Sequence, residues 1–500
     1  MSRIIPLWAP VLICLYALPA ACVFAAETTP PSAVAPAPPG PAVTPAPAPA
    51  AETPAEPVET GDEPAAPELL DPAIQLGTPA GFGAPASTTD LSLGTPRGRG
   101  VRLGTTRLHP YLGMRFESRS NVFYETRRVH ADTLEALDLG VHWTSSARSI
   151  PPGSAGARLL ADYNARFEVF NWFSELNYIS QNALVAAELR TPDFGVDLVD
   201  RLGTAHDPDT VELATLVNRE VRRFYHHLEL SAFQPRGEDP TAGRFGVAAT
   251  MDNARYEGPA LNAAETDGYG LHFSWSQPQS LVSWASDPVI FKFSMQGFDH
   301  PQPVLNNFVM YQAVVKFSGT LGEPADVTRH GATAPEPWDF ELVLGVAAID
   351  VQTFHALSPQ RRQDALVPVA AFQIDGDLNT RQYLHLRLNA LHEPDVSLTS
   401  NYLRRTRIAG TLNQHLGDAY EWELSAAEEW ADPSQGPTLA QFTFQGEVRW
   451  YKEFPNRYFG RHAPVFFRIA SRDVDTAERN RTGVHTWNDT RLTVGWALAL

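Results

Sequence analysis

The amino-acid sequence predicts an all-β fold, and three observations support this prediction. From about residue 107 to the end, apolar and polar residues alternate with a period of two, which indicates strands rather than amphipathic helices. About eighteen such segments follow one another, and most have the roughly 9 to 12 residues that cross a bilayer at a tilt. After the N-terminus, no apolar run approaches the roughly 20 residues of a spanning helix.

The first 25 residues have the features of a cleavable signal peptide. Arg3 precedes a short apolar run, and Val23 and Ala25 are the small residues expected before a cut that follows Ala25. A transmembrane anchor is the alternative, but the run is short and is interrupted by prolines. A lipoprotein site at Cys22 is a weaker alternative, because Pro19 stands where an aliphatic residue is expected. We therefore expect export, and the exported chain would contain no cysteine.

Residues 26–98 form a Pro/Ala-rich, acidic tract with no Lys or Arg before Arg97. Such a composition cannot bury a core, so we predict a disordered linker with polyproline II character. Its simplest role is a solvated tether on the periplasmic side. A more specific role is contact between the apolar cluster at residues 68–76, "ELLDPAIQL", and a periplasmic partner or the mouth of the folded domain.

The segment at residues 160–170, "LADYNARFEVF", shows the two-residue period most clearly. In a soluble sandwich its apolar face would meet a second sheet, whereas in a membrane barrel that face meets lipid and the charged face meets a wet lumen. The apolar face consists of Ala161, Tyr163, Ala165, Phe167 and Val169, and the polar face of Asp162, Asn164, Arg166 and Glu168.

A barrel explains the rest of the chain better than a sandwich does. A sandwich rarely continues for about 400 residues as one domain. A charge facing lipid costs about 2 to 4 kcal/mol at mid-membrane, and the quoted strands keep Lys and Arg off one face. Aromatic residues such as Trp143, Trp172 and Trp450 gather near strand ends, as in interfacial girdles, although the core of a soluble β domain would also contain aromatics. We predict a single transmembrane, antiparallel, up-and-down β-barrel of about 18 strands (16 to 18) over residues 99–500.

The connections suggest an orientation. If the first strand rises from the periplasm, odd connections are external and long, and even connections are tight. The segments near 118–131, 204–220, 351–365 and 472–487 fit the external set, and "RTPD", "DGDLNT" and "HLGD" fit the tight set. The long segment at 320–337 breaks the rule and suggests that a strand has been miscounted there.

The block "RLHPYLGMRFESRSNVFYE" resembles the opening of a family of outer-membrane β-barrel porins, with Asn121, Val122 and Phe123 at its turn. The later segment "FGVDLVDRLGTAHDPDTVELATLVNREVRR" is similar to that group's strand and long polar loop. The resemblance covers about residues 107–500. Some members accompany exopolysaccharide synthesis, so it implies an outer-membrane conduit. One departure is Leu500, where such barrels usually end in Phe or Trp.

Motifs for catalysis or cofactors are not found. The sequence has no phosphate loop, dinucleotide fingerprint or paired-cysteine zinc motif, and we expect no cofactor and no metal site. His226 and His227 are adjacent, so in a strand they point to opposite faces and cannot share a metal. A rim enzyme using His142, His272 or Ser274 remains an alternative that no spacing selects, and we expect no enzymatic activity. The net charge of -18 makes a nucleic-acid partner unfavourable.

We therefore expect an outer-membrane conduit in a Gram-negative bacterium. The favoured hypothesis is export of a polysaccharide with a separate periplasmic export protein. The alternatives are a general diffusion porin for small polar solutes and a plugged structural or surface barrel. Barrels of 16 to 18 strands leave an aqueous channel. The residues expected to line it are Asp162, Asn164, Arg166, Glu168, His385, Arg387, Glu421, Glu423, Glu447 and Arg449.

Overall fold

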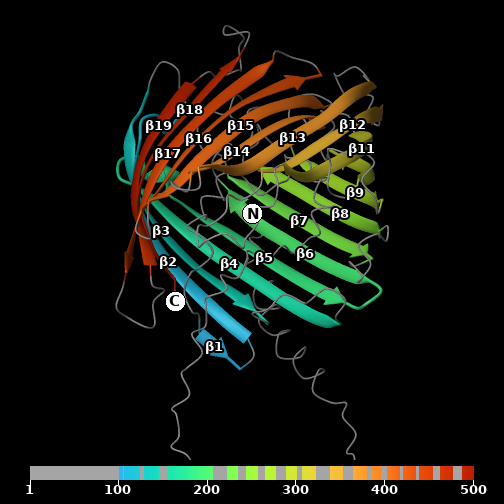
Figure 1. Cartoon of the computed structure of the whole chain (residues 1–500). Coiled ribbons are helices and arrows are strands. Elements are labelled where there is room, and N and C mark those ends of the chain that lie inside the picture. The colour runs from blue at the N-terminus through green and yellow to red at the C-terminus, as the bar shows by residue number, and fades with distance from the viewer. Residues whose placement is uncertain are drawn as a thin grey trace, which may run out of the picture. The chain divides into compact units, whose positions relative to one another are not determined.

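The computed structural model shows a closed antiparallel β-barrel (Figure 1). It describes residues 101–104, 106–123, 129–145, 155–205, 222–234, 244–256, 265–277, 289–300, 307–321, 338–352, 364–379, 384–395, 402–416, 420–434, 438–453, 462–476 and 487–499. The expected leader and the whole of the expected linker, residues 26–98, lie outside these residues.

Eighteen strands form the ring, each paired with its sequence neighbours. The first nine are β2 (Thr106–Arg119), β3 (Asp132–Thr144), β4 (Gly156–Phe170), β5 (Tyr178–Arg190), β6 (Gly195–Ala205), β7 (Arg223–Phe233), β8 (Arg244–Tyr256), β9 (Thr266–Ser276) and β10 (Ile290–Asp299). The others are β11 (Asn307–Leu321), β12 (Trp338–Gln352), β13 (Ala365–Asn379), β14 (Leu384–Asp395), β15 (Leu403–Leu416), β16 (Tyr420–Pro433), β17 (Leu439–Glu453), β18 (His462–Thr476) and β19 (Trp487–Ala499).

The last strand closes the ring on the first. β19 pairs antiparallel with β2, from Arg491 opposite Arg119 to Ala499 opposite Tyr111. A nineteenth strand, β1 (Val101–Leu103), is a three-residue extension that pairs with the start of β2. The turn between them places Gly104 at a φ of 65°, a conformation that favours glycine. The all-β barrel of about 18 strands is thus confirmed.

The suspected miscount does not affect the ring of described strands. β11 and β12 pair along their whole length, from Asn307 opposite Gln352 to Leu321 opposite Trp338. The long connection at residues 322–337 therefore joins two adjacent strands at the end of the barrel where β2 begins, and the suspicion of a miscount was wrong. The only helical element in the described part of the chain is a 3-10 turn, Ser174–Leu176, after β4.

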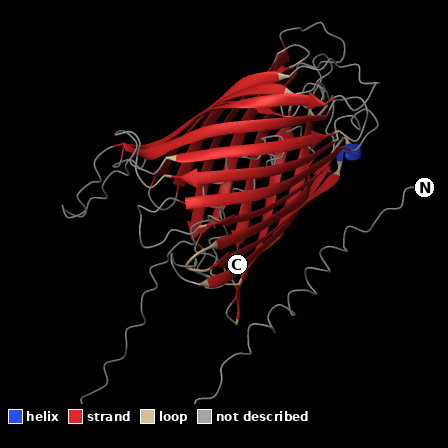
Figure 2. Cartoon of the chain, turned by 90° about the vertical axis from the view of Figure 1, so that its right-hand side faces the viewer, coloured by secondary structure: helices blue, strands red, loops and turns tan. Residues whose placement is uncertain are grey.

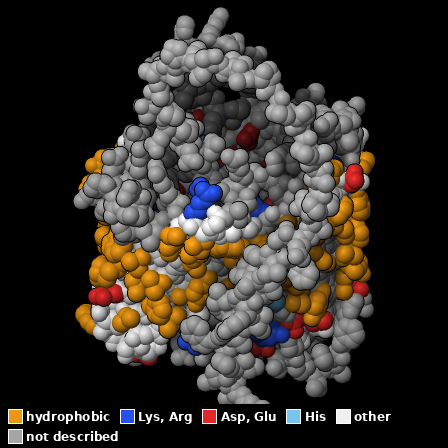
Figure 3. Space-filling model, turned by 90° about the horizontal axis from the view of Figure 1, so that it is seen from below, with side chains coloured by type: hydrophobic (Ala, Val, Ile, Leu, Met, Phe, Trp, Pro, Cys, Tyr) orange, Lys and Arg blue, Asp and Glu red, His pale blue; other side chains and the backbone are white. Residues whose placement is uncertain are grey.

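The two faces of the wall differ in composition because the strands keep the two-residue period. The outward face is apolar and exposed: Leu139, Val169 and Val494 are 40%, 51% and 48% exposed. Figure 3 shows hydrophobic side chains gathered in a band around the outside and acidic side chains in the hollow. Figure 2 shows the strands lying side by side around the curved wall. Among the described residues, no helix is both long and apolar enough to cross a membrane.

Candidate functional site

The inward side of the wall carries ionic side chains from neighbouring strands. On β4, Asp162, Asn164, Arg166 and Glu168 alternate with the outward Val169 set and share the inward face. Arg166 Nε donates to Asp138 of β3 at 2.5 Å, and Asp162 accepts from the His142 ring at 3.2 Å. Arg166 and Asp162 are therefore both paired with side chains of the neighbouring strand β3.

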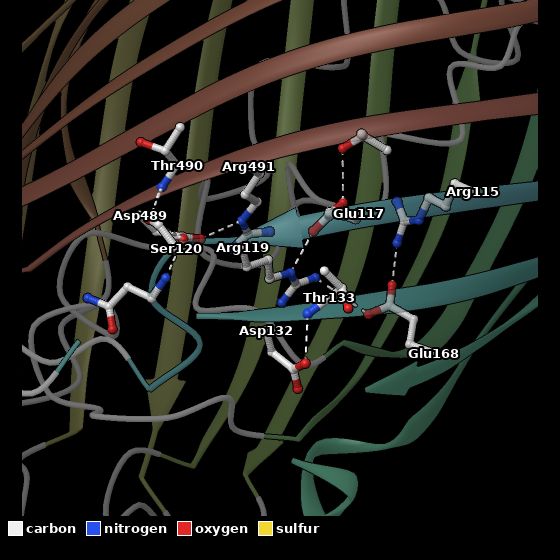
Figure 4. A network of polar contacts seen from close by, with 12 residues as sticks. Arg115, Glu117, Arg119, Ser120, Asp132, Thr133, Glu168, Asp489, Thr490 and Arg491 are labelled. Carbon is white, nitrogen blue, oxygen red and sulfur yellow. Dashed lines mark hydrogen bonds and ion pairs between the residues drawn. The ribbon is translucent and has the colours of Figure 1, made fainter. Parts of the chain in front are cut away.

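The C-terminal half of β2 adds a network of ion pairs that is almost completely buried (Figure 4). Glu168 binds Arg115 and lies 3.5 Å from Arg119, and Arg119 is also 2.5 Å from Glu117. All four side chains are at most 8% exposed. Glu117 also accepts from the Thr493 hydroxyl of β19, so the network crosses the seam where the ring closes.

Strands β16, β17 and β18, beyond β19 on the other side of the seam, form a second network. Arg449 of β17 contacts Glu447, Glu421 and Glu423, the last two at 3.2 and 3.8 Å. Glu447 is shared with Arg468 of β18 at 2.5 Å. Two cations thus separate three carboxylates that the strand pairing would otherwise place side by side.

A third group lies on β13 and β14. His385 contacts Asp375 and lies 3.2 Å from Asp377, and Arg387 binds Asp375 at 2.6 Å. All ten residues chosen from the sequence thus share the inward face but fall into three separate groups. The structure brings Glu421, Glu423, Glu447 and Arg449 into one network, joins the four residues of β4 to β3, β2 and β5, and leaves His385 and Arg387 apart from both.

Sequence reasoning missed several inward residues. Arg115, Glu117, Arg119, Arg468 and Asp489 were not chosen. The alternation beside Phe116 carried the same information for β2 as it did for β4. What it could not give is the partner of each charge, because partners depend on the register between strands.

The inward face also has an apolar sector, which the sequence analysis did not anticipate. Its members are inward-facing and buried, and β8 and β10 to β13 supply all but one of them. Across β11 and β12, for example, Met310 lies opposite Ile349, and Gln312 lies opposite Ala347. The sector consists of Ala254, Tyr256, Phe298, Phe308, Met310, Val314, Val343, Ala347, Ile349, Val351, Val367, Val369 and Tyr402.

The adjacent histidines point to opposite faces, as the strand period predicted. His226 contacts Asp200 on the outward face, and His227 contacts Asp252 on the inward face, where Asp252 is 3% exposed. The described residues contain no group of three His, Cys, Asp or Glu placed to hold a metal ion. Beyond the end of β10, burial lowers the pKa of His300 to about 4, so this ring stays neutral at neutral pH.

A closed ring of strands, an apolar outer belt and an ionic inner wall define the class of this protein. A closed barrel gives the backbone N–H and C=O groups of its strands hydrogen-bond partners within the protein, which lipid cannot supply. Strands that alternate apolar residues on the outside with polar residues on the inside are typical of outer-membrane barrels. The chain is an outer-membrane β-barrel with the architecture of a porin.

The comparisons with known proteins concern the fold. No family model and no curated protein matches the chain. Solved structures that are similar include the outer membrane protein OpdK from Pseudomonas aeruginosa, at 10% identity and a TM-score of 0.41, covering 79% of this chain and 99% of that one. OccK2 from the same organism, in complex with glucuronate, is 10% identical, with a TM-score of 0.41, and the match covers 80% of this chain and 100% of that one. A BenF-like porin from Pseudomonas fluorescens is 8% identical, with a TM-score of 0.41, and the match covers 80% of this chain and 100% of that one. No residue role is taken from these structures.

Proposed function

We propose that this barrel is a channel through which small polar solutes diffuse across the outer membrane. The observation that carries the proposal is the inner wall, where acidic and basic side chains from adjacent strands are paired. A polar solute can exchange hydrogen bonds with such a wall and with water at little net change in free energy. Weak contacts at many sites favour passage over retention.

Because the acidic and basic side chains are paired, the wall should bind neither anionic nor cationic solutes strongly. Arg468 lies between Glu447 and the seam, and Arg166 lies against Asp138, so few inward charges act alone in the networks described above. A wall dominated by one sign would instead concentrate counter-ions strongly. The arrangement therefore fits solutes of modest charge.

Export of a polysaccharide, which the sequence favoured, gains less support. The apolar sector around Ala347 and Ile349 offers the hydroxyls of a saccharide chain no side-chain partners where the chain passes along it. A small solute can follow the ionic part of the wall instead.

The test is conductance of the purified barrel in planar bilayers, combined with swelling of liposomes in small sugars and amino acids. We expect open channels whose ion selectivity depends on the inward charges. In Glu447→Gln, Arg449 and Arg468 lose a shared anion, so the permeability ratio should shift toward anions by about twofold or more. The matched control is Glu428→Gln, because Glu428 is exposed and pairs in register with the outward Ile408 and Phe442.

Two results would contradict the proposal. The first is a folded barrel without conductance or solute uptake, which would indicate a plugged structural barrel. The second is loss of surface polysaccharide after deletion of the gene, together with exclusion of small solutes, which would restore the export hypothesis. Equal selectivity shifts in both glutamate variants would show that the inward wall does not line the path.

A further inference from the structure

The wall contains a small pocket where β8, β9, β10 and β11 lie side by side, which we call the β8–β11 pocket. Small residues form its floor: Gly246 and Ala248 of β8, Ser274 of β9 and Ser294 of β10. The register brings them together, since Gly246 pairs with Ser274, while Ala248 and Ser294 both pair with His272. These neighbouring small side chains leave a hollow in the wall.

The β8–β11 pocket faces the lumen. Phe245, Trp275 and Phe293, which have outward parity on the same strands, are 45% to 50% exposed. Ala248 and Ser294 have the opposite parity and are 2% and 6% exposed. Because successive side chains of a strand point to opposite faces, the pocket belongs to the inner wall and not to the lipid-facing belt.

Polar groups from three strands surround the floor of the pocket. Lys292 of β10 supplies an ammonium group, and His272 of β9 and Gln312 of β11 supply an imidazole and an amide. The hydroxyl groups of Ser274 and Ser294 can donate two further hydrogen bonds. None of the described residues that line the pocket is an Asp or a Glu. This combination of one cation, hydroxyls and an amide suits an anionic group.

The inward positions beside the pocket, at the end of the barrel where β2 begins, are also basic. Arg244 of β8 and Lys316 of β11 each lie one register position from the pocket. Two inward acids nearby have basic partners: Glu341 binds Lys316 at 2.5 Å, and Asp252 binds His227 at 2.5 Å. Basic residues gathered at one place on a wall raise the local concentration of anions.

We propose that the β8–β11 pocket binds the phosphate group of a small solute. The cation of the pocket is a lysine, which binds phosphate as a point charge, whereas the planar fork of an arginine matches a carboxylate with two parallel hydrogen bonds. A phosphate group offers three acceptor oxygens, so groups that converge from β9, β10 and β11 can each reach one. A carboxylate offers two.

The proposal deepens the channel function and rests on it for one point, that the solute reaches the pocket through the lumen. Contacts of this kind must be weak enough for the solute to leave again. We therefore expect a dissociation constant in the millimolar range, which is compatible with passage. Binding itself does not require conductance, so the two can be measured separately.

Phosphorus NMR of inorganic phosphate, titrated with the purified full chain in detergent at constant ionic strength, measures the binding. Lys292→Gln should weaken it at least tenfold. The matched control is Lys316→Gln with Glu341→Gln, because it removes a neighbouring inward lysine together with the carboxylate that binds it. This control should change the affinity by twofold or less. Acetate should compete with phosphate at least fivefold more weakly than sulfate, which is also tetrahedral.

A second pair of variants tests the shape of the pocket and keeps all its charges. Ala248→Leu fills the hollow and should weaken phosphate binding at least tenfold. Ala249→Leu places the same side chain on the outward face, where Ala249 is exposed, and should leave binding unchanged. The heat-dependent gel shift of each variant shows that its barrel is folded.

Four results would overturn the proposal: no phosphate binding by the folded barrel, equal loss in Lys292→Gln and in its matched control, binding retained in folded Ala248→Leu, or acetate competing as well as sulfate. Conductance without phosphate binding would overturn the pocket and leave the channel standing. Phosphate binding by a barrel that does not conduct would support the pocket and contradict the channel.

Discussion

At the scale of single residues, the strongest constraints lie where one carboxylate serves several donors. Asp132, at the start of β3, is 3% exposed and accepts backbone N–H groups from Thr133, Trp172 and Phe173 at 2.7, 3.2 and 3.1 Å. It thereby fixes the connection between β4 and β5, which lies beside it at the barrel rim. Hydrogen bonds to an ionised acceptor contribute more than neutral ones.

Replacing this carboxylate should loosen the rim without unfolding the barrel. In Asp132→Ala, two N–H groups of the connection lose their acceptor, at a cost of about 1 to 3 kcal/mol. We expect chymotrypsin to cut the folded protein faster after Trp172, whose side chain is 78% exposed. Mass spectrometry of the fragments measures the change. Glu135→Ala, at an exposed position on the same strand, is the control, and equal cutting rates in the two variants would contradict the role of Asp132.

At the scale of elements, close packing of side chains over glycine joins neighbouring strands on the inner wall. The Tyr225 hydroxyl of β7 donates to the Asn182 side-chain oxygen of β5 at 2.6 Å, passing over Gly203 of β6. A Cβ at Gly203 would lie 2.2 Å from the Asn182 oxygen and 2.7 Å from the Tyr225 hydroxyl. The hydrogen bond thus spans three strands because the middle one has no side chain there.

Gly203→Ala should break this link. We expect a loss of about 1 to 3 kcal/mol in the free energy of unfolding, as for overpacked sites, measured by urea titration of the barrel in lipid vesicles. Gly297→Ala is the matched control, since a Cβ at Gly297 of β10 meets no atom within 4 Å. A loss of the same size at both positions would show that the strand propensity of alanine, rather than the Tyr225–Asn182 contact, controls the outcome.

Much of the arrangement of the strands could be predicted from the sequence. The period of two assigns Asp162 and Glu447 to the same side of the wall as the buried charges, and it predicts a ring of about eighteen strands. It could not pair Glu447 with Arg468, or Tyr225 with Asn182, because such contacts depend on register across strands. Nor did it reveal Asp200, which breaks the rule that the outward face is apolar.

At the scale of the whole molecule, the apolar belt determines where the protein can reside. Exposed side chains such as Phe116 and Phe467, both 50% exposed, would aggregate in water but are stable against lipid. The closed ring leaves no strand edge unpaired in the described wall, apart from the short β1. Together these features make the outer membrane the location of the chain.

This location predicts the behaviour of the protein on extraction. The chain should be recovered with outer membranes, and it should migrate faster on a gel before heating than after, because the folded barrel resists detergent until it is heated. Gel mobility with and without boiling, on fractionated cells, is the measurement. Recovery in the detergent-free periplasmic fraction would contradict the membrane assignment.

The pairing of β19 with β2 has a consequence for the order of assembly. Tyr111 and Ala499 are neighbours in space but are separated by nearly the whole folded sequence, so this seam is the contact of longest range in the ring. Every other pairing in the ring joins consecutive strands, whereas closure requires β19, the last strand in the sequence order. Until then β2 and β18 expose free edges, which are templates for pairing with foreign strands. A sheet that lacks only this closure is therefore exposed to pairing with foreign strands, and the seam, which includes the Thr493–Glu117 hydrogen bond, removes both edges.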